Sequence, residues 1–336
     1  MNICFFTYSY KPDSVDNLPN IFAEGTRKQS YGDIIEVLDC TDINYAKIQE
    51  KIKNIDLAVI SGTWGSVHHS RTSDSPIGHM NKINQTVKYL TKTMNKTLLV
   101  FESPTLSRSR SSVQTLKNFH PRYYRASLDH WVYGLGEFFT KDYDYYRFEQ
   151  FCKANRLLKT KTESLWASRS LDAPVLILPE KNSAPTLHGI DPGAWVDTVV
   201  HTLRESTRRP IWIKPSPHHL ENIDYNKYEH MGVTLLNKET NLNELLKEVW
   251  ATVILDSTAC FESLWQGVPV FCYPGSFAGE LGNTDITKID APVRVPLIPW
   301  WQKMAYTEFT QQEIQRGTIW SYIRPQILDS ITRKNK

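Results

Sequence analysis

The sequence contains no run of about 18 uninterrupted apolar residues, so it predicts no helix that crosses a membrane. Its opening residues also lack the basic segment and cleavable apolar run of a secretory signal. Cysteine is scarce, and no two of the five residues have the spacing of metal ligands: Cys4, Cys40, Cys152, Cys260 and Cys272. Most of them stand in strand-like apolar runs, which is typical of buried free thiols in a reducing compartment. We therefore expect a cytoplasmic protein without membrane insertion.

Two nucleotide-binding signatures are also missing. Gly275, Gly279 and Gly282 do not make the pattern G-x-G-x-x-G, and no G-x-x-x-x-G-K-[ST] occurs, which argues against a dehydrogenase or a P-loop protein.

The possible metal-binding motifs of the sequence are equally weak. Asp142-Tyr143-Asp144 imitates a D-x-D metal motif but falls in an aromatic, helix-like stretch. The adjacent pairs His68-His69 and His218-His219 cannot both face one metal from a regular element, so we expect no bound metal.

The length of the chain and the alternation of its strands and helices indicate two α/β domains. At 336 residues the chain suits two domains of about 150 residues each, and 40% hydrophobic residues supply material for two cores. The boundary is expected near Lys153–Ala173, which gives an amino-terminal domain at 1–160 and a carboxyl-terminal domain at 161–336. Strands alternating with helices predict a mostly parallel, doubly wound sheet.

Short apolar runs bounded by polar loops predict the strands. In the first part they are Asn2–Tyr8, Asp33–Leu38, Ile55–Ser61 and Thr97–Glu102. In the second part they are Pro174–Leu178, Ile211–Lys214, Val233–Leu236, Thr252–Leu255 and Val268–Tyr273. A one-sided apolar stripe predicts a helix before the fourth strand, and Asp191 and Asn241 are expected to cap helices in the second part. The aromatic stretch Arg122–Phe151 is expected to be mostly helical or irregular.

The charge of the chain is distributed unevenly. The formal net charge is only +3, but the stretch from Arg71 to Arg125 holds ten Lys or Arg residues against two acids, Asp74 and Glu102. That stretch therefore carries +8, and the remainder of the chain carries −5. Such an asymmetry indicates a polyanionic partner for the basic part. The alternative is that its lysines only keep a helix face soluble.

Three predicted strands end in polar segments, and doubly wound sheets bind ligands at the carboxyl ends of their strands. The segments are Lys214-Pro215-Ser216-Pro217-His218, Asp256-Ser257-Thr258 and Glu102-Ser103-Pro104. Ser257 and Thr258 stand where a helix is expected to begin, and its free N–H groups favour a phosphate. A capped helix without a ligand is the alternative. Lys214 would neutralise a diphosphate or would be an ordinary solvated lysine.

The run Asp256-Ser257-Thr258-Ala259-x-x-Glu262-x-Leu264-x-x-Gly267-x-Pro269-Val270 resembles the donor-site segment of GT-B glycosyltransferases. Within that class it is most similar to the capsule polysaccharide Kdo-transferase-like group, as are the stretches Asp191–Lys214 and Phe101–Arg108. The resemblance covers most of the carboxyl half and only patches of the amino half. It implies a GT-B architecture, in which two Rossmann-like domains face each other across a cleft. It also implies that a helical stretch within Tyr306–Ile331 crosses back to the first domain.

The same resemblance implies a nucleotide-sugar donor, in the first instance a UDP-sugar, with no tightly bound cofactor. The implied donor-binding residues are Lys214, Ser216, His218, Asp256, Ser257, Thr258 and Glu262. The group often has His where this chain has Ser216, so His218 is the candidate to replace that contact. Glu102 is implied as the catalytic acid or base, and pairing with Arg108 or Arg110 is its structural alternative. Asp129 and Asp13 are the next candidates for the base.

Phage-encoded relatives of this group glycosylate modified pyrimidines in phage DNA, and the compact length of this chain suits them. The expected acceptor is therefore double-stranded DNA with hydroxylated or hydroxymethylated pyrimidines, such as hydroxymethylcytosine in a bacteriophage genome. The residues expected to hold it are Arg108, Arg110, Arg122, Arg125, Trp64 and His68. Two other functions stay open: a capsule or lipopolysaccharide glycosyltransferase, and a non-catalytic module that binds nucleotide sugar or DNA.

Overall fold

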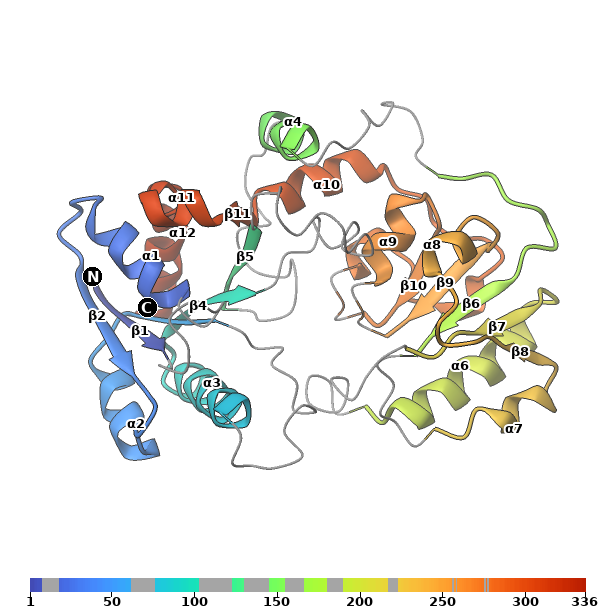
Figure 1. The fold of residues 1–336 in the computed structure, drawn as a ribbon, viewed down its shortest axis with the longest axis horizontal. Coiled ribbons are helices and arrows are strands. Elements are labelled where there is room, and N and C mark those ends of the chain that lie inside the picture. The colour runs from blue at the N-terminus through green and yellow to red at the C-terminus, as the bar shows by residue number, and fades with distance from the viewer. Residues whose placement is uncertain are drawn as a thin grey trace. The chain divides into compact units, whose positions relative to one another are not determined.

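The computed structural model describes residues 1–7, 18–61, 76–102, 123–129, 145–154, 166–179, 190–216, 223–255, 257, 259–274, 276 and 278–336. The chain forms two compact units, and each has its own β-sheet (Figure 1). The first unit comprises Met1–Leu157 together with Trp301–Lys336, and the second comprises Leu158–Trp300. No helix in these described ranges is long and apolar enough to cross a membrane.

The sheet of the first unit has six strands in the order β11-β5-β4-β3-β1-β2. The strands are β1 (Asn2–Thr7), β2 (Ile34–Asp39), β3 (Leu57–Ser61), β4 (Thr97–Glu102), β5 (Tyr123–Leu128) and β11 (Glu308–Thr310). The first four are parallel, and β5 and β11 extend the sheet in antiparallel pairing. From β1 the chain winds outward to β2 and then returns to the other side for β3. The winding therefore reverses between β1 and β3.

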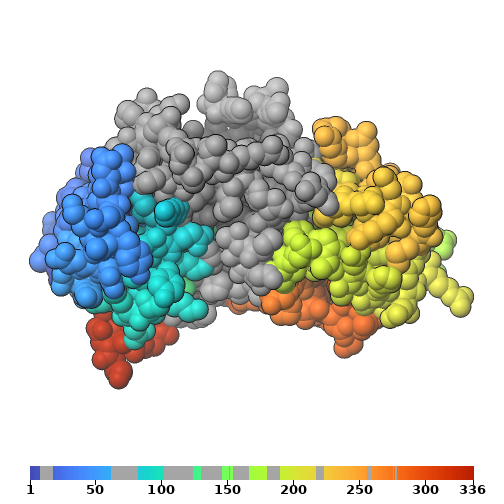
Figure 2. Space-filling view, turned by 90° about the horizontal axis from the view of Figure 1, so that it is seen from below, coloured from blue at the N-terminus to red at the C-terminus, as the bar shows by residue number. Residues whose placement is uncertain are grey.

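Helices cover both faces of this sheet (Figure 1). The helices of this unit are α1 (Leu18–Arg27), α2 (Tyr45–Lys53), α3 (Pro76–Thr93), α4 (Tyr145–Ala154), α11 (Gln311–Arg316) and α12 (Thr318–Lys334). The surface view shows α2 and α3 side by side (Figure 2). On the other face, Phe22 of α1 makes edge contacts with Phe5, Phe101 and Trp320, at centroid distances of 5.4, 4.9 and 5.8 Å. Because α12 supplies Trp320 to this core, the carboxyl-terminal segment belongs to the first unit.

The second unit has a sheet of five parallel strands in the order β10-β9-β6-β7-β8. The strands are β6 (Val175–Leu178), β7 (Ile211–Ile213), β8 (Val233–Leu235), β9 (Ala251–Ile254) and β10 (Val270–Cys272). The helices are α6 (Pro192–Ser206), α7 (Asn226–Glu229), α8 (Leu242–Leu245) and α9 (Ala259–Trp265), with α10 (Leu297–Ala305) at the limit between the units. Short 3₁₀ turns η5 (Gly279–Leu281) and η6 (Ile286–Lys288) follow β10.

The capping residues predicted for the second unit are confirmed. The Asp191 carboxylate accepts a hydrogen bond from the backbone N–H of Ala194 at 2.8 Å, and Pro192 occupies the first turn of α6, where no intrahelical donor is needed. Asn241 accepts from the N–H of Asn243 at 2.9 Å at the start of α8. All five cysteines are buried and none of them forms a disulfide, as expected.

Every predicted strand is present close to its expected bounds, but four elements of the first unit were not predicted: β5, β11, α1 and α2. The expectation for Arg122–Phe151 is wrong at β5, where Tyr124, Ala126 and Leu128 alternate into the core with the period of a strand. Helices α1 and α2 were not predicted. The first contains proline and glycine, which weaken a helical pattern, and the second buries only Ile48 and Ile52.

The division of the chain also differs from the expected one. The structural limit between Leu157 and Leu158 lies close to the predicted boundary at 160. The segment 301–336 was assigned to the second domain, with a helical stretch within Tyr306–Ile331 expected to cross back to the first, and the whole segment lies in the first unit. The buried stripe of α12, formed by Ile319, Trp320, Ile323 and Ile327, completes the core of the first sheet, which explains this return.

Candidate functional site

The topology of the second sheet indicates where a ligand binds. β6 is central, the chain winds to β7 and β8 on one side, and it then returns to β9 and β10 on the other. In open α/β sheets of this order, ligands bind at the carboxyl ends of the strands where the winding reverses. Here that point lies between β6 and β9. Lys214, Ser257 and Glu262 all follow strands at this edge.

Lys214, directly after β7, is a buried lysine, so the interpretation of a solvated side chain is wrong. Its residue is 6% exposed, and its ammonium donates to the carbonyl oxygens of Lys238 at 2.8 Å and Pro215 at 3.4 Å. An ammonium has three donors, so within the described part of the chain one N–H is left for a ligand. Burial lowers the pKa of Lys214, and the negative charges of Glu239 and Glu262 oppose this effect. The structure therefore brings Lys214 and Glu262 within electrostatic reach of each other.

Ser257 connects β9 to α9. Its hydroxyl accepts from the backbone N–H of Ala259 at 3.3 Å, and its carbonyl accepts from Cys260 at 3.1 Å. The serine thus caps the beginning of α9, which agrees with the alternative interpretation of the motif as a helix cap without a ligand. Its side chain is half-buried, so capping does not exclude a ligand contact.

The remainder of the motif shapes the exit from α9. Glu262 stands in the first turn of the helix, where a carboxylate interacts favourably with the helix dipole. Gly267 adopts φ of 67°, the left-handed conformation that ends a helix, and Val268 then bonds back to Ser263. The carbonyl of Pro269 accepts from Thr252, which leads the chain into β10 beside β9. The glycine and proline of the motif therefore serve the fold, and the described polar residues, Ser257 and Glu262, lie at the beginning of α9.

Other predicted donor residues have different outcomes. Ser216 is described and half-buried in the same loop as Lys214. His218, Asp256 and Thr258 lie outside the described residues. Among the described residues no group of three His, Cys, Asp or Glu side chains is arranged as metal ligands would be.

The first sheet has its own reversal of winding, between β1 and β3. Thr7 ends β1 and Ser61 ends β3, and both are 7% exposed. The carbonyl of Ser61 accepts from the side-chain amide of buried Asn84 in α3 at 2.9 Å. The Thr7 hydroxyl is buried and makes no hydrogen bond within the described part of the chain. The ends of β1 and β3 therefore place uncharged polar groups at the reversal of the first sheet, whereas the edge of the second sheet presents Lys214.

Glu102, the candidate base, is the last residue of β4, and its backbone pairs with Arg125 of β5. Arg125 was expected to contact an acceptor phosphate, and this expectation is wrong. The residue is 0% exposed because β5 is an interior strand between β4 and β11. The other residues expected to bind the acceptor, Arg108, Arg110, Arg122, Trp64 and His68, lie outside the described residues.

Asp129 is not available as an alternative base. Its carboxylate accepts from the N–H of Leu98 at 2.8 Å and from the hydroxyl of Ser330 at 2.8 Å, and it pairs with Lys334 at 2.6 Å. Leu98 lies at the amino end of β4, so Asp129 is at the opposite edge of the sheet from Glu102. Through these contacts Asp129 connects α12 to β4. Asp13, the remaining alternative, lies outside the described residues.

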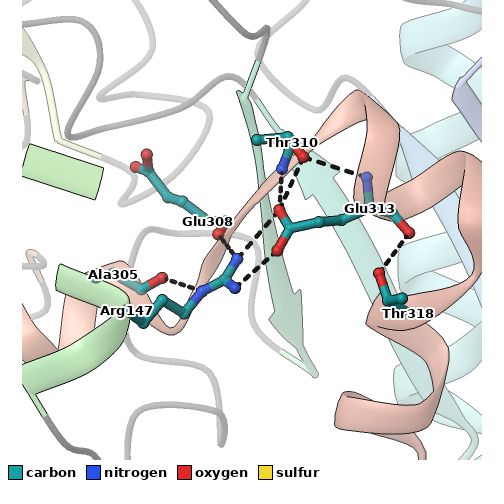
Figure 3. A network of polar contacts seen from close by, with 6 residues as sticks. All are labelled: Arg147, Ala305, Glu308, Thr310, Glu313 and Thr318. Atoms are coloured by element: carbon teal, nitrogen blue, oxygen red, sulfur yellow. Dashed lines mark hydrogen bonds and ion pairs between the residues drawn. The ribbon is translucent and has the colours of Figure 1, made fainter. Parts of the chain in front are cut away.

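Sequence reasoning missed a group of charged residues around β11. Arg147 of α4 contacts Ala305, Glu308 and Glu313, which lie far away in the sequence (Figure 3). Burial raises the pKa of Glu313, but the hydrogen bonds and charge of Arg147 outweigh this, so the pKa lies below its ordinary value. The sequence Thr310-x-x-Glu313 is a capping-box pattern and could have predicted the beginning of α11, where the structure shows the capping box.

The two units, with their mostly parallel sheets and reversals of winding, define a protein of the GT-B fold, the two-domain Rossmann-like architecture found in glycosyltransferases. Among solved structures, the chain is similar to the β-Kdo 2,7-transferase KpsC of Thermosulfurimonas dismutans, with 13% identity, coverage of 95% of this chain and 99% of that chain, and a TM-score of 0.50.

Two further structures are similar at lower scores. The β-Kdo 2,4-transferase KpsC of the same organism has 13% identity, coverage of 90% and 89%, and a TM-score of 0.49. The E. coli heptosyltransferase WaaC with ADP-2-deoxy-2-fluoro heptose has 14% identity, coverage of 81% and 88%, and a TM-score of 0.28. The sequence matches no protein-family model and no curated protein.

Proposed function

We propose that the protein is a glycosyltransferase that takes a sugar from a nucleotide-sugar donor, in the first instance a UDP-sugar. The observation that carries this proposal is the buried Lys214 at the carboxyl edge of the second sheet, within electrostatic reach of Glu262. A buried ammonium group at the end of a strand can bind a diphosphate strongly, because electrostatic attraction is stronger where water is excluded. Glu262 would accept hydrogen bonds from ribose hydroxyls, and Ser257 with the first N–H groups of α9 would complete the phosphate contacts.

The proposed reaction is direct displacement at the anomeric carbon. As the acceptor oxygen bonds to that carbon, its proton passes to the Glu102 carboxylate. The bond from the anomeric carbon to the diphosphate oxygen breaks, and its electron pair leaves with the diphosphate. Lys214 stabilises the negative charge that develops on this leaving group. The proposed reaction requires no tightly bound metal.

For the acceptor we propose a hydroxylated or hydroxymethylated pyrimidine in double-stranded phage DNA. The +8 stretch from Arg71 to Arg125 supports a polyanionic partner. Within it, Lys82 and Lys92 of α3 are exposed, and Tyr89 between them is 61% exposed. Lysines can neutralise phosphates and an exposed aromatic ring can stack on a base.

A second acceptor class has its own support. The fold is shared with a Kdo transferase at a TM-score of 0.50, which favours a capsule or lipopolysaccharide glycan as the acceptor. The uncharged polar groups at the ends of β1 and β3 also suit sugar hydroxyls.

One experiment separates these proposals from a non-catalytic module. The protein is incubated with radiolabelled UDP-glucose and with a panel of other nucleotide sugars. Each donor is combined with hydroxymethylcytosine DNA, with unmodified DNA, or with a lipopolysaccharide core oligosaccharide. Label in modified DNA alone supports the DNA acceptor, and label in the oligosaccharide replaces it with the glycan. Nucleotide binding without label in any acceptor or in free sugar would contradict the enzymatic proposal.

A further inference from the structure

Helices α2 and α3 lie side by side in the first unit and form one continuous surface (Figure 2). The described side chains of the two helices include six lysines and a single acid, Glu50. We call the surface that carries these lysines the lysine face. Because α2 lies outside the basic stretch from Arg71 to Arg125, only the fold joins its charge to that stretch. The lysines are Lys47, Lys51 and Lys53 of α2 and Lys82, Lys88 and Lys92 of α3.

Most of the positive charge of the lysine face has no acid beside it. Four of its lysines are exposed and form no ion pair among the residues that the structure describes: Lys47, Lys53, Lys82 and Lys92. Lys51 is different, because it pairs with Glu36 of β2. Surfaces of mixed charge are sufficient for solubility, so solubility alone does not explain a face of one sign. Such pairing is common elsewhere in the chain, where five further lysines each pair with an acid: Lys153, Lys227, Lys247, Lys288 and Lys334.

The positive charges of the lysine face repel one another. Lys88 and Lys92 stand one turn apart on α3, and like charges at this spacing destabilise a helix. Burial and the charge of Lys92 lower the pKa of Lys88 to about 7. An anion bound beside these two residues would relieve the repulsion. The lysine face therefore suits a partner that carries several negative charges.

The uncharged side chains between the lysines indicate which kind of polyanion fits. Tyr45 and Tyr89 are 50% and 61% exposed, and Gln85 is partly exposed. Phenol and amide groups donate hydrogen bonds to the phosphate oxygens of nucleic acids. Helices that lie on a membrane instead place Trp, Phe or Leu beside their lysines. No side chain of these three types is exposed on the described parts of α2 and α3, so the lysine face favours a nucleic acid.

We propose that the lysine face binds the phosphate backbone of double-stranded DNA without reading its sequence. This inference rests on the proposed DNA acceptor and names the surface that would hold the duplex. Lys82 and Lys92 are separated by ten residues, or about 15 Å along α3, and packed helices lie about 8–10 Å apart. Duplex DNA carries one charge per about 1.7 Å of its axis, so a face of this size meets several phosphates. Contacts to phosphates position a duplex and carry no information about its bases.

Binding of unmodified duplex DNA tests this inference without any transfer of sugar. A fluorescent duplex of about 20 base pairs is titrated with the protein, and its anisotropy is measured from about 50 to 300 mM NaCl. Lys47→Gln/Lys53→Gln changes α2 alone. It should reduce the steepness of log affinity against log salt by about 2 and weaken binding at low salt about tenfold or more. Lys153→Gln/Lys247→Gln is the matched control. It removes the same charge from lysines with 60% and 61% exposed side chains, and it should leave the slope unchanged.

Three results would overturn the inference. The first is an unchanged slope in the α2 variant, and the second is the lack of salt-sensitive duplex binding in the wild type. The third is cosedimentation with phosphatidylcholine vesicles that contain phosphatidylserine, if the α2 variant loses it, because the lysine face would then belong to a membrane. Since the replaced side chains are exposed, both variants should keep the Tm of the wild type.

The same variants separate this inference from the proposed function. Sugar transfer to modified DNA by an α2 variant that binds DNA with the wild-type slope would leave the proposed function standing and remove the lysine face from it. Salt-sensitive duplex binding that depends on Lys47 and Lys53, in a protein that transfers no sugar, would support the lysine face and contradict the proposed function.

Discussion

Gly25 of α1 and Gly317 at the junction of α11 and α12 touch through their backbones. A Cβ built on Gly317 would lie 2.1 Å from the carbonyl oxygen of Gly25, and one built on Gly25 would lie 2.1 Å from the carbonyl oxygen of Ile314. Gly317 also adopts φ of 76°. Only glycine at both positions lets the carboxyl-terminal helices approach α1 so closely.

Gly25→Ala should therefore destabilise the first unit by about 3 kcal/mol, because the clash is with backbone that cannot rotate away. Gly32→Ala is the control: Gly32 has a left-handed φ of 71° but nothing within 4 Å of the added Cβ, so the cost should be only about 1 kcal/mol. Urea unfolding measures both. Equal losses in the two variants would contradict the importance of the helix contact.

Asp33 should give the first unit an acid-sensitive contribution to stability. Burial raises its pKa, but the hydrogen bonds from Arg324 and Trp320 and the charges of Arg324 and the amino terminus outweigh burial, so the pKa lies below its ordinary value. The contribution is therefore fully present above the unfolded pKa of about 3.9 and is lost as the pH falls through the lower folded value. The difference in free energy of unfolding between wild type and Asp33→Asn should be large at pH 7 and shrink toward pH 2. A difference that is independent of pH would count against this account.

Lys214→Met should weaken UDP binding about tenfold or more, since a buried charge-assisted hydrogen bond is lost. Lys247→Met is the control, because Lys247 is a surface lysine with a 61% exposed side chain that pairs with Glu244. Since burial lowers the pKa of Lys214, wild-type affinity should decline with rising pH earlier than it would for an exposed lysine near 10.4. Calorimetry across pH 6 to 10 measures both effects. Unchanged affinity in Lys214→Met would place the diphosphate elsewhere.

Glu102→Gln should reduce turnover by about a hundredfold or more, because the variant keeps the shape of the side chain and removes the base. Nucleotide affinity should remain that of the wild type, because the donor residues lie in the other unit. Transfer assays with single-turnover controls measure the chemical step. Near-normal turnover would remove Glu102 from the reaction.

Lys82→Gln/Lys92→Gln should reduce the salt dependence of DNA binding. Each phosphate contact contributes about 0.9 to the slope of log affinity against log salt, so losing two should lower the slope by about 2. Lys247→Gln/Lys288→Gln, which removes two exposed lysines of the second unit, is the control and should leave the slope unchanged. Identical slopes in wild type and both variants would mean that the α3 lysines only solubilise the helix.

The sequence by itself determined the parallel strands of both sheets and the fold class. Continuous apolar runs such as Ala251–Ile254 predict strands that are buried on both faces of a sheet. The capping of α6 by Asp191 and the end of α9 at Gly267 depend on contacts within a few residues, so the local sequence predicts them as well. It also located the polar edge of the second sheet, because Lys214 directly follows β7 and Ser257 stands between β9 and α9.

Tertiary structure alone decided the rest. Arg125 looks like a surface cation in sequence, and only the pairing of β5 between β4 and β11 buries it. Asp129 resembles a free carboxylate, and only the return of α12 brings Ser330 and Lys334 to it. Local sequence patterns indicate which residues are apolar and where helices begin and end. Partners separated by some two hundred residues are chosen by packing, which no local pattern records.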